Sequence, residues 1–352
     1  MQGDEMHMAD ALISPAVGAG MWAAATGIAL YSIKKVQDME NHKVPLMAVM
    51  GAFVFAAQMI NFSIPGTGSS GHLGGGLLLA ILLGPYAGFL TMASVLIIQA
   101  LFFADGGLLA LGCNIFNLGF YPCFIIYPLI YRVLVNGKPS TGRLFTGTLT
   151  AAVIGLQFGA LSVVLETVVS GRTELPFSTF VMLMQPIHLA IGIVEGLVTA
   201  SIISFVWKAR PEIIEHTNST GGISVSRVLA AFALAAILTG GVLSWFASTR
   251  PDGLEWSIAK VSGQEQLANS GAIHKALAAI QAKVALLPGY AFKSGQESPA
   301  PEQAQQWPAV SGGTSFSGLV GGIMTLLLAG LAGLGIMYVK KLRKARALVE
   351  RI

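Results

Sequence analysis

Apolar segments long enough to cross a lipid bilayer recur along the whole of this 352-residue chain. Each crossing of roughly 30 Å of hydrocarbon needs about 20 predominantly apolar residues in a helix. Hydrophobic residues make up 54% of the sequence and charged residues only 11%, whereas a soluble globular domain carries roughly a quarter charged residues. The mean hydropathy is +0.69. These features exclude a soluble domain and predict an all-α, polytopic transmembrane helical bundle.

Hydropathy read in windows of about 19 residues predicts nine membrane spans. They lie near residues 14–33, 45–62, 73–83, 86–104, 108–132, 144–169, 184–207, 226–247 and 317–339. The third span is short and glycine-rich, which indicates a half-helix or a strongly tilted helix. We expect it to end at Gly84-Pro85, because proline cannot continue a helix.

The spans divide into two modules. A seven-span module covers residues 6–208, a polar cytoplasmic linker covers 209–226, and a two-span module covers 227–352. The two-span module is a hairpin whose helices flank a polar external segment at about residues 250–315. This segment is much longer than an ordinary connection, so we expect it to be either functional or disordered.

The positive charges indicate the orientation, because cytoplasmic loops retain Lys and Arg. With the N-terminus outside and the C-terminus inside, 15 of the 21 basic residues lie in cytoplasmic loops or in the C-terminal tail. The short outside loops contain only Arg172, and the other five lie in the long external segment, to which the rule does not apply. The tail from Lys340 to Arg351 therefore predicts a topology anchor attracted to anionic membrane lipid, and nucleic acid is not needed to explain it.

The segment before the first span contains a histidine. Ser14 and Pro15 predict the N-cap and first position of the first helix, so Met6 and His7 precede that helix. The intervening residues are apolar enough to enter the bundle, where irregular backbone is tolerated only under a cover of protein.

A second histidine, His72, follows a glycine-rich loop on the same outer side. The loop contains a GxGxxG pattern, residues 66–71, but it lies between membrane spans and not in a βαβ unit, so it predicts no dinucleotide site. His72 is the one side chain of this stretch that coordinates a metal strongly. The glycines allow its backbone to bend sharply and to approach another segment closely.

These histidines suggest a square of nitrogen ligands, which favours nickel(II) or copper(II). A free amine on Met6, the amide of His7 and the His7 ring would form a planar chelate, and the His72 ring would complete the square. Two histidines more often serve structure than metal binding, so the residues alone leave both interpretations open.

Three segments closely resemble the nickel and cobalt substrate-binding components of energy-coupling factor transporters, of the NikM and CbiM type. They are residues 6–15 (MHMADALISP), residues 68–76 (GSSGHLGGG) and residues 251–256 (PDGLEW). The hairpin module resembles the small accessory component of the same systems, here fused to the larger one. Its motif is Pro251, Asp252, Gly253, Leu254 and Glu255.

The resemblance implies a subunit that captures nickel(II) or cobalt(II) as transported substrate, with no permanently bound cofactor. It implies that Met6, His7 and His72 supply the metal ligands. It also implies a location in the cell membrane, with a transmembrane coupling subunit and cytoplasmic ATPase subunits as separate chains. The residues after His7, Met-Ala-Asp-Ala-Leu, look more like those of the nickel members. The family begins at Met-His, whereas five residues precede Met6 here. We expect an upstream start codon assigned in error, because a retained extension would turn the amine into an amide.

Other polar residues support competing hypotheses. His188 and Glu195 lie seven residues apart on one face of the last span of the large module. They are either a functional pair within the membrane or a buried pair that holds helices together. A self-sufficient secondary metal transporter would use these two residues, but such proteins normally have several membrane carboxylates. An intramembrane metalloenzyme would need a pattern such as HExxH, which this sequence lacks.

Small residues line one side of the first span at Ala16, Gly20 and Ala23. This seam either packs inside the bundle or forms the groove where a coupling subunit docks. Cys113 and Cys123 are expected to be buried structural thiols. The external segment contains six further polar residues, which we expect to be solvated and not to deliver metal: Asp252, Glu255, Glu265, His274, Glu297 and Glu302.

The orientation can be tested with reporter fusions. We expect a reporter after Lys138 or at the C-terminus to be cytoplasmic and one inserted near Gln296 to be external, because basic residues are retained inside. Accessibility of each reporter from the two sides of the membrane is the measurement. An external C-terminus would contradict the nine-span arrangement.

Overall fold

The computed structural model describes residues 7–36, 43–135, 139–172, 175–215, 224–263, 267, 271–292 and 307–349. Each of the nine predicted spans coincides with helix. In chain order the helices are α1 (Pro15–Lys35), α2 (Lys43–Gln58), α3 (Gly76–Leu83), α4 (Pro85–Phe102), the continuous helical segment α5–η2–α6 (Leu111–Ile115, Phe116–Tyr131 and Arg132–Val135), α7 (Thr141–Ser170), α8 (Phe177–Ala209), α10 (Val225–Gly241) and α13 (Gly312–Val349).

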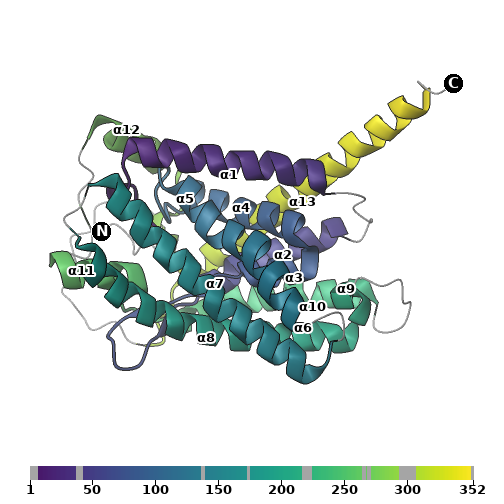
Figure 1. Cartoon of the computed structure of the whole chain (residues 1–352), viewed down its shortest axis with the longest axis horizontal. Helices are drawn as coiled ribbons and strands as arrows, with labels where there is room; N and C mark the ends of the chain where they lie inside the picture. The colour runs from purple at the N-terminus through teal and green to yellow at the C-terminus, as the bar shows by residue number, and fades with distance from the viewer. Residues whose placement is uncertain are drawn as a thin grey trace.

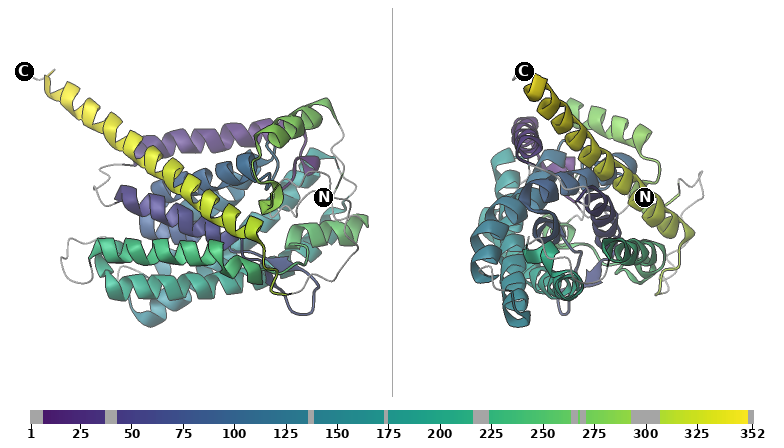
Figure 2. Two further views of the ribbon diagram at one scale, coloured as in Figure 1. Left: turned by 180° about the vertical axis from the view of Figure 1, so that it is seen from behind. Right: turned by 90° about the vertical axis from the view of Figure 1, so that its right-hand side faces the viewer.

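The long helices form a bundle, and α13 crosses it obliquely (Figures 1 and 2). Among the described residues, six helical segments are long and apolar enough to cross a membrane, and α2 and α10 are shorter apolar helices. The predicted fold class, a polytopic helical membrane protein, is confirmed. The total of nine spans and the sides of the two termini stay predictions.

The third predicted span is a half-helix, as its length suggested. Gly75, at φ 77°, caps the start of α3, and Gly84, at φ 82°, ends it before Pro85 opens α4. Its eight residues rise only about 12 Å. The chain before α3 must therefore enter the bundle as irregular backbone. It contains the short antiparallel strands β1 (Phe62–Ser63) and β2 (Ser70–Gly71).

Helix α1 begins where the sequence predicts. The Ser14 side chain accepts a hydrogen bond from the amide of Val17, and Pro15 occupies the first turn. Before it lies the short 3₁₀ turn η1 (Asp10–Leu12). Ala16, Gly20 and Ala23 are exposed along α1, so the first of the two alternatives for this seam, packing inside the bundle, is wrong.

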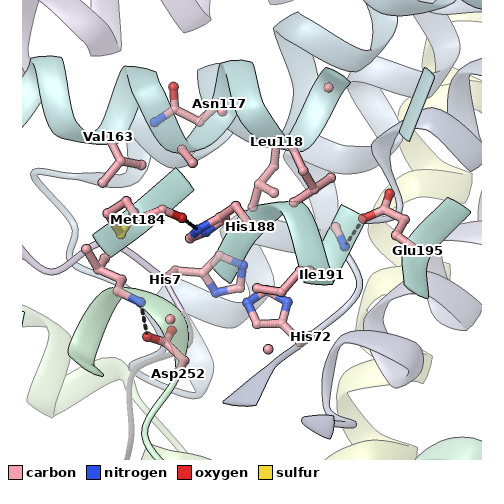
Figure 3. A pocket seen from close by; sticks show the side chains of 18 of the residues that line it. His7, His72, Asn117, Leu118, Val163, Met184, His188, Ile191, Glu195 and Asp252 are labelled. Carbon is pink, nitrogen blue, oxygen red and sulfur yellow. Dashed lines mark hydrogen bonds between the residues drawn. The ribbon is translucent and has the colours of Figure 1, made fainter. Parts of the chain in front are cut away.

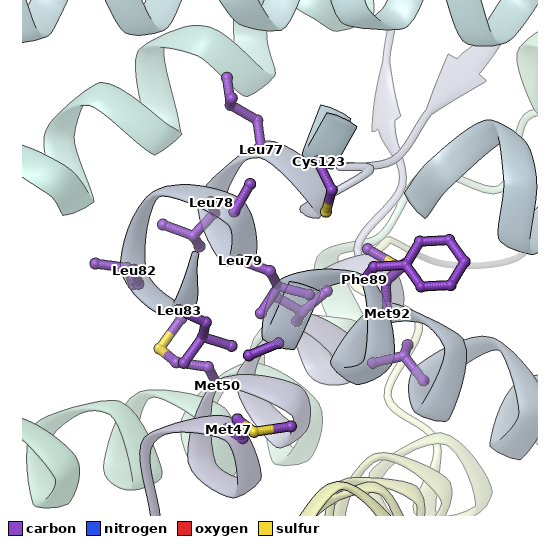
Figure 4. Close-up of a cluster of buried hydrophobic side chains, with 14 of the residues drawn as sticks. Met47, Met50, Leu77, Leu78, Leu79, Leu82, Leu83, Phe89, Met92 and Cys123 are labelled. Carbon is purple, nitrogen blue, oxygen red and sulfur yellow. The ribbon is translucent and has the colours of Figure 1, made fainter. Parts of the chain in front are cut away.

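The hydrophobic core lies between α2, α3 and α4 and is filled by interlocking aliphatic, methionine and phenylalanine side chains (Figure 4). Cys123 belongs to this cluster, and Cys113 belongs to a second cluster near the start of α1. Both cysteines are free and buried, as expected. The segment from Phe116 to Tyr131 winds as a wide π-helix with Pro122 and Pro128 inside it.

The hairpin module packs on α2. Helices α10 and α13 both contact α2 and cross each other closely, since the backbones of Gly240 and Gly318 meet there. Gly321 of α13 has no side chain, and the Phe55 ring occupies the space that a Cβ atom there would fill. The remaining short helices are α9 (Pro211–Glu215), after α8, and η3 (Leu243–Phe246), after α10.

The described part of the external segment is helical and packs against the bundle. It consists of α11 (Gly253–Ser262), α12 (Ala272–Val284) and η4 (Pro288–Tyr290), which lie at the same end of the bundle as the described N-terminus (Figures 1 and 2). Asp252, Glu255 and His274 are buried, so the expectation that they are solvated is wrong. The other three acidic residues of this segment, Glu265, Glu297 and Glu302, lie outside the described residues.

Candidate metal centre

The segment ahead of α1 lies inside the bundle as irregular backbone held by polar side chains. The Met8 amide donates to Asn114 Oδ1 at 3.1 Å, and Asn114 Nδ2 donates to the Met8 carbonyl at 3.2 Å. Asp10 Oδ1 accepts from two backbone amides of the turn before α5, at 2.7 and 2.9 Å. These bonds satisfy backbone groups that water cannot reach. They fix His7, which is 5% exposed.

The His7 ring is oriented by Asp105, which lies in the turn between α4 and α5. Nδ1 of His7 lies 3.0 Å from Oδ1 of Asp105, and the Tyr290 hydroxyl donates to Oδ2 at 2.5 Å. Burial alone would raise the pKa of the Asp105 carboxyl, but the attraction of His7 and the hydrogen bonds from His7 and Tyr290 lower it overall. The carboxylate is therefore ionised and accepts the ring N–H. Among the described residues, His7 Nε2 is buried without a hydrogen-bond partner.

His72 enters the bundle from the glycine-rich loop. After β2 the loop reaches the middle of α8, where the amides of Gly74 and Gly75 donate to the two carboxylate oxygens of Glu195 at 2.8 and 3.1 Å. Gly75 adopts a left-handed conformation, and a Cβ atom there would lie 2.7 Å from the Val54 side chain. The glycines thus permit the close approach that the sequence predicts.

His7 and His72 come together although they lie on different segments of the chain. Their ring centroids are 5.2 Å apart, with planes inclined at 52°. Both line a cavity of about 100 Å³. Figure 3 shows the two rings on one side of this cavity, His188 beside them, Glu195 at one end and Asp252 at the other. The structure therefore gathers at one cavity the two histidines that the sequence singled out.

Side chains alone do not complete a metal site here. Within the described ranges, no group of three His, Cys, Asp or Glu side chains is arranged to hold a metal ion. The predicted set contains only two imidazoles, and its other two donors are backbone nitrogens. Met6, which would supply the amine, lies outside the described residues, as do residues 1–5.

His188 and Glu195 both line the cavity, as their shared helix face suggested, but they bind different groups. His188 Nδ1 lies 2.8 Å from the carbonyl of Met184, one helical turn earlier. Glu195 instead binds the two amides of the glycine-rich loop. The hypothesis that these two residues hold helices together is therefore wrong, since Glu195 joins α8 to a loop and not to another helix.

Comparison with known proteins assigns the chain to a family. The family model described as "Cobalt uptake substrate-specific transmembrane region" matches residues 7–213, and that of the "PDGLE domain" matches residues 226–337. The chain belongs to the cobalt uptake substrate-specific transmembrane family. It carries a PDGLE domain on the C-terminal side of that region.

Relatives of this family member include nickel and cobalt transport proteins. A protein of Archaeoglobus fulgidus, provisionally named a fused nickel transport protein NikMN, is 33% identical over 232 residues, which are 66% of this chain and 76% of that protein. The fused nickel transport protein NikMN of Rhodobacter capsulatus is 30% identical over 59% of this chain and 64% of its own length. The cobalt transport protein CbiM of Sorangium cellulosum is 27% identical over 60% of this chain and 95% of its own length.

A solved structure shares the fold of the larger module. The crystal structure of a truncated transition metal transporter aligns with 58% of this chain and 99% of its own, with a TM-score of 0.51 and 31% identity. The chain is thus a multi-pass membrane protein of a metal transport family.

The PDGLE motif joins the two modules at the cavity. Asp252 caps α11, since its Oδ1 accepts from the amides of Leu254 and Glu255, both at 2.8 Å. A Cβ atom on Gly253 would lie 2.6 Å from the side chain of Ile187, so only glycine lets α11 pack this closely on α8. The Pro251 carbonyl accepts from the amide of Ser70 in the glycine-rich loop at 2.8 Å.

Sequence reasoning missed the residues that orient the site. Asp105 lies in the turn between α4 and α5, Asn114 lies in α5, and Tyr290 comes from the external segment. The run Asp105-Gly106-Gly107 after an apolar span was a signal for a turn at the outer side, because such residues favour turns. Nothing in the sequence pairs Tyr290 with Asp105.

Glu195 can be tested as a structural residue. Glu195→Gln replaces one of the two acceptor oxygens by an NH₂ group, so one loop amide loses its partner and the protein should lose about 1–3 kcal/mol of stability. Nickel(II) affinity should fall much less than in His72→Ala. The measurements are thermal unfolding in detergent and nickel titration of both variants. If Glu195→Gln left stability unchanged and weakened nickel binding as much as His72→Ala, Glu195 would be a ligand.

Proposed function

We propose that this chain captures nickel(II), or else cobalt(II), at the outer side of the cytoplasmic membrane for uptake into the cell. One observation carries the proposal: His7 and His72, from separate segments, meet at a buried cavity with their ring centroids 5.2 Å apart. The family and its relatives support the class of substrate. The fused nickel transport proteins among them, together with the residues after His7, favour nickel.

The proposed ligands are the Met6 amine, the His7 amide, the His7 ring and the His72 ring. Four nitrogens in a plane suit nickel(II). The need for backbone donors agrees with the small number of side-chain ligands in the described part of the chain. A site of this kind requires Met6 to be the true N-terminus.

The His7 ring must turn when the chelate forms. The His7 amide and ring close a six-membered chelate only through Nδ1, the nitrogen that faces Asp105. Rotation about the bond between Cβ and the ring brings Nδ1 to the metal and Nε2–H toward the same carboxylate. In the turned orientation Asp105 would accept Nε2–H and leave Nδ1 for the metal.

The energy for transport comes from other chains in this proposal. The sequence has no GxxxxGK[ST] loop to bind nucleotide phosphates. A transmembrane coupling subunit and cytoplasmic ATPase subunits would complete the importer. The exposed seam of Ala16, Gly20 and Ala23 on α1 offers the coupling subunit a surface that a helix can approach closely.

The secondary-transporter alternative ranks below this proposal. It needs a membrane carboxylate that binds and releases cations or protons. Glu195 instead holds two backbone amides of the loop that carries His72. No further observation in the described structure favours that alternative.

The ligand set makes a prediction about the N-terminus. Nickel must displace protons from the amine and amide, so its affinity should fall steeply as the pH is lowered. His72→Ala should weaken binding at least about a hundredfold, because loss of even an outer partner of a metal ligand costs 10–100-fold. His7→Ala should do the same, and so should residues added before Met6, although every side chain remains. Nickel titration of a chain that starts at Met6 provides the reference.

The extension is the decisive control. A chain shown by mass spectrometry to retain residues 1–5 should bind nickel much more weakly than the chain that starts at Met6. Equal tight binding by both would exclude the amine as a ligand. The site would then lie among His72, His188 and Glu195.

Separate ATPase subunits make a second prediction. The purified chain should bind nickel without hydrolysing ATP, because it has no nucleotide-binding loop. A coupled assay for phosphate release on a preparation free of other subunits is the measurement. ATP hydrolysis by the chain alone would contradict the assignment as a capture subunit.

A further inference from the structure

The external segment of the PDGLE module reaches the turn that carries Asp105. The amides of Leu286 and Leu287 donate to the carbonyl of Phe102 at 2.9 and 3.1 Å, and the amide of Gly289 donates to the carbonyl of Phe103 at 2.8 Å. Backbone bonds thus fix this part of the segment on the end of α4. They bring Tyr290 next to the metal cavity of the other module.

Tyr290 is held by packing and by an unusual backbone. Its ring stacks on Phe103, with centroids 5.0 Å apart and an interplanar angle of 18°. Tyr290 has φ 59° and Ala104, just before Asp105, has φ 52°. Residues other than glycine rarely adopt this conformation, and such outliers tend to occur at functional sites. The stacking and the backbone conformation therefore fix the position of the Tyr290 ring against the end of α4.

The Tyr290 hydroxyl begins a chain of hydrogen bonds that ends at the proposed metal ligand. It donates to Asp105 Oδ2 at 2.5 Å, and Asp105 Oδ1 lies 3.0 Å from His7 Nδ1. The three residues are 8%, 3% and 5% exposed. Burial and the neighbouring carboxylate raise the pKa of Tyr290 well above its ordinary value, so the hydroxyl keeps its proton and remains a donor.

We propose that Tyr290 is a positioning residue through which the PDGLE module sets the metal affinity of the other module. Its hydroxyl fixes the Asp105 carboxylate, which holds Nδ1–H of His7 in the structure. Once the ring has turned to form the proposed chelate, the same carboxylate would accept Nε2–H and leave Nδ1 for the metal. This inference rests on the proposed function, because it takes His7 as a ligand. Outer partners of metal-bound histidines commonly fix the tautomer and the ring orientation, and their loss weakens metal binding about 10–100-fold.

The test is nickel(II) titration of the full chain that starts at Met6. Tyr290→Phe removes only the hydroxyl and keeps the ring that stacks on Phe103, so affinity should fall about 10–100-fold while the chain stays folded. Tyr131→Phe is the matched control. The Tyr131 hydroxyl is buried and has no hydrogen-bond partner among the described residues, so its loss should leave nickel affinity unchanged.

A double-mutant cycle separates positioning from general destabilisation. If Tyr290 acts through Asp105, Tyr290→Phe should cost little further affinity in a chain that already carries Asp105→Asn. Equal losses in both backgrounds would overturn the proposal. The ligand-field absorption of bound nickel at saturation gives a second readout. It should change in Tyr290→Phe but not in Tyr131→Phe, and it decides the question if Asp105→Asn does not fold.

His72→Ala distinguishes failure of this inference from failure of the proposed function. If His72→Ala abolishes tight binding while Tyr290→Phe binds nickel like the unmodified chain, with the same spectrum, only the positioning role is overturned. If neither His72→Ala nor His7→Ala weakens binding, the proposed site is wrong and the inference falls with it.

Discussion

Backbone groups at membrane depth must find partners within the protein, and this requirement shapes the whole site. The two segments that carry His7 and His72 are irregular, so their amides and carbonyls cannot satisfy one another as in a helix. Asn114 binds the backbone of the first segment, whose own Asp10 accepts from the turn before α5, and Glu195 binds the second segment. Gln58 Nε2 donates to the carbonyl of Gly74 at 2.8 Å, and Gln99 in turn donates to Gln58 at 2.9 Å. Many of the buried polar side chains therefore bind backbone groups of the irregular segments. These bonds hold the two histidine rings at the cavity.

The two modules build one outer end between them. The Ser70 amide binds the carbonyl of Pro251, and the Ser248 amide binds the carbonyl of Asn61, both across the module boundary. In addition, His274 Nε2 lies 2.8 Å from the carbonyl of Ile13, just before α1. The external segment thus holds both irregular segments in place. A chain that fuses the modules keeps these contacts intramolecular, which spares the entropy of bringing two subunits together.

The sequence was sufficient for the helices and insufficient for the contacts between them. Hydropathy located the helices of the predicted spans because most of the apolar runs have about the length of a membrane crossing. Gly84-Pro85 marked the end of the shorter α3 because both residues break helices. The two histidines were found through a motif. Helical spacing misassigned Glu195, since its partners are backbone amides, which no residue type identifies. Tyr290 was missed because it meets Asp105 across 185 residues of sequence.

The acidic residues around the cavity bear on how the proposed metal site would favour a transition metal over the harder cations. Asp105, Glu195 and Asp252 each accept hydrogen bonds from the protein: Asp105 from a ring and a hydroxyl, the other two from backbone amides. Magnesium and calcium require oxygen ligands, and carboxylates already held in this way would have to give up those bonds to bind them. Imidazole and backbone nitrogens remain as donors, and these suit nickel(II). The same hydrogen bonds that support the irregular backbone would therefore also bias the proposed site toward nitrogen ligation.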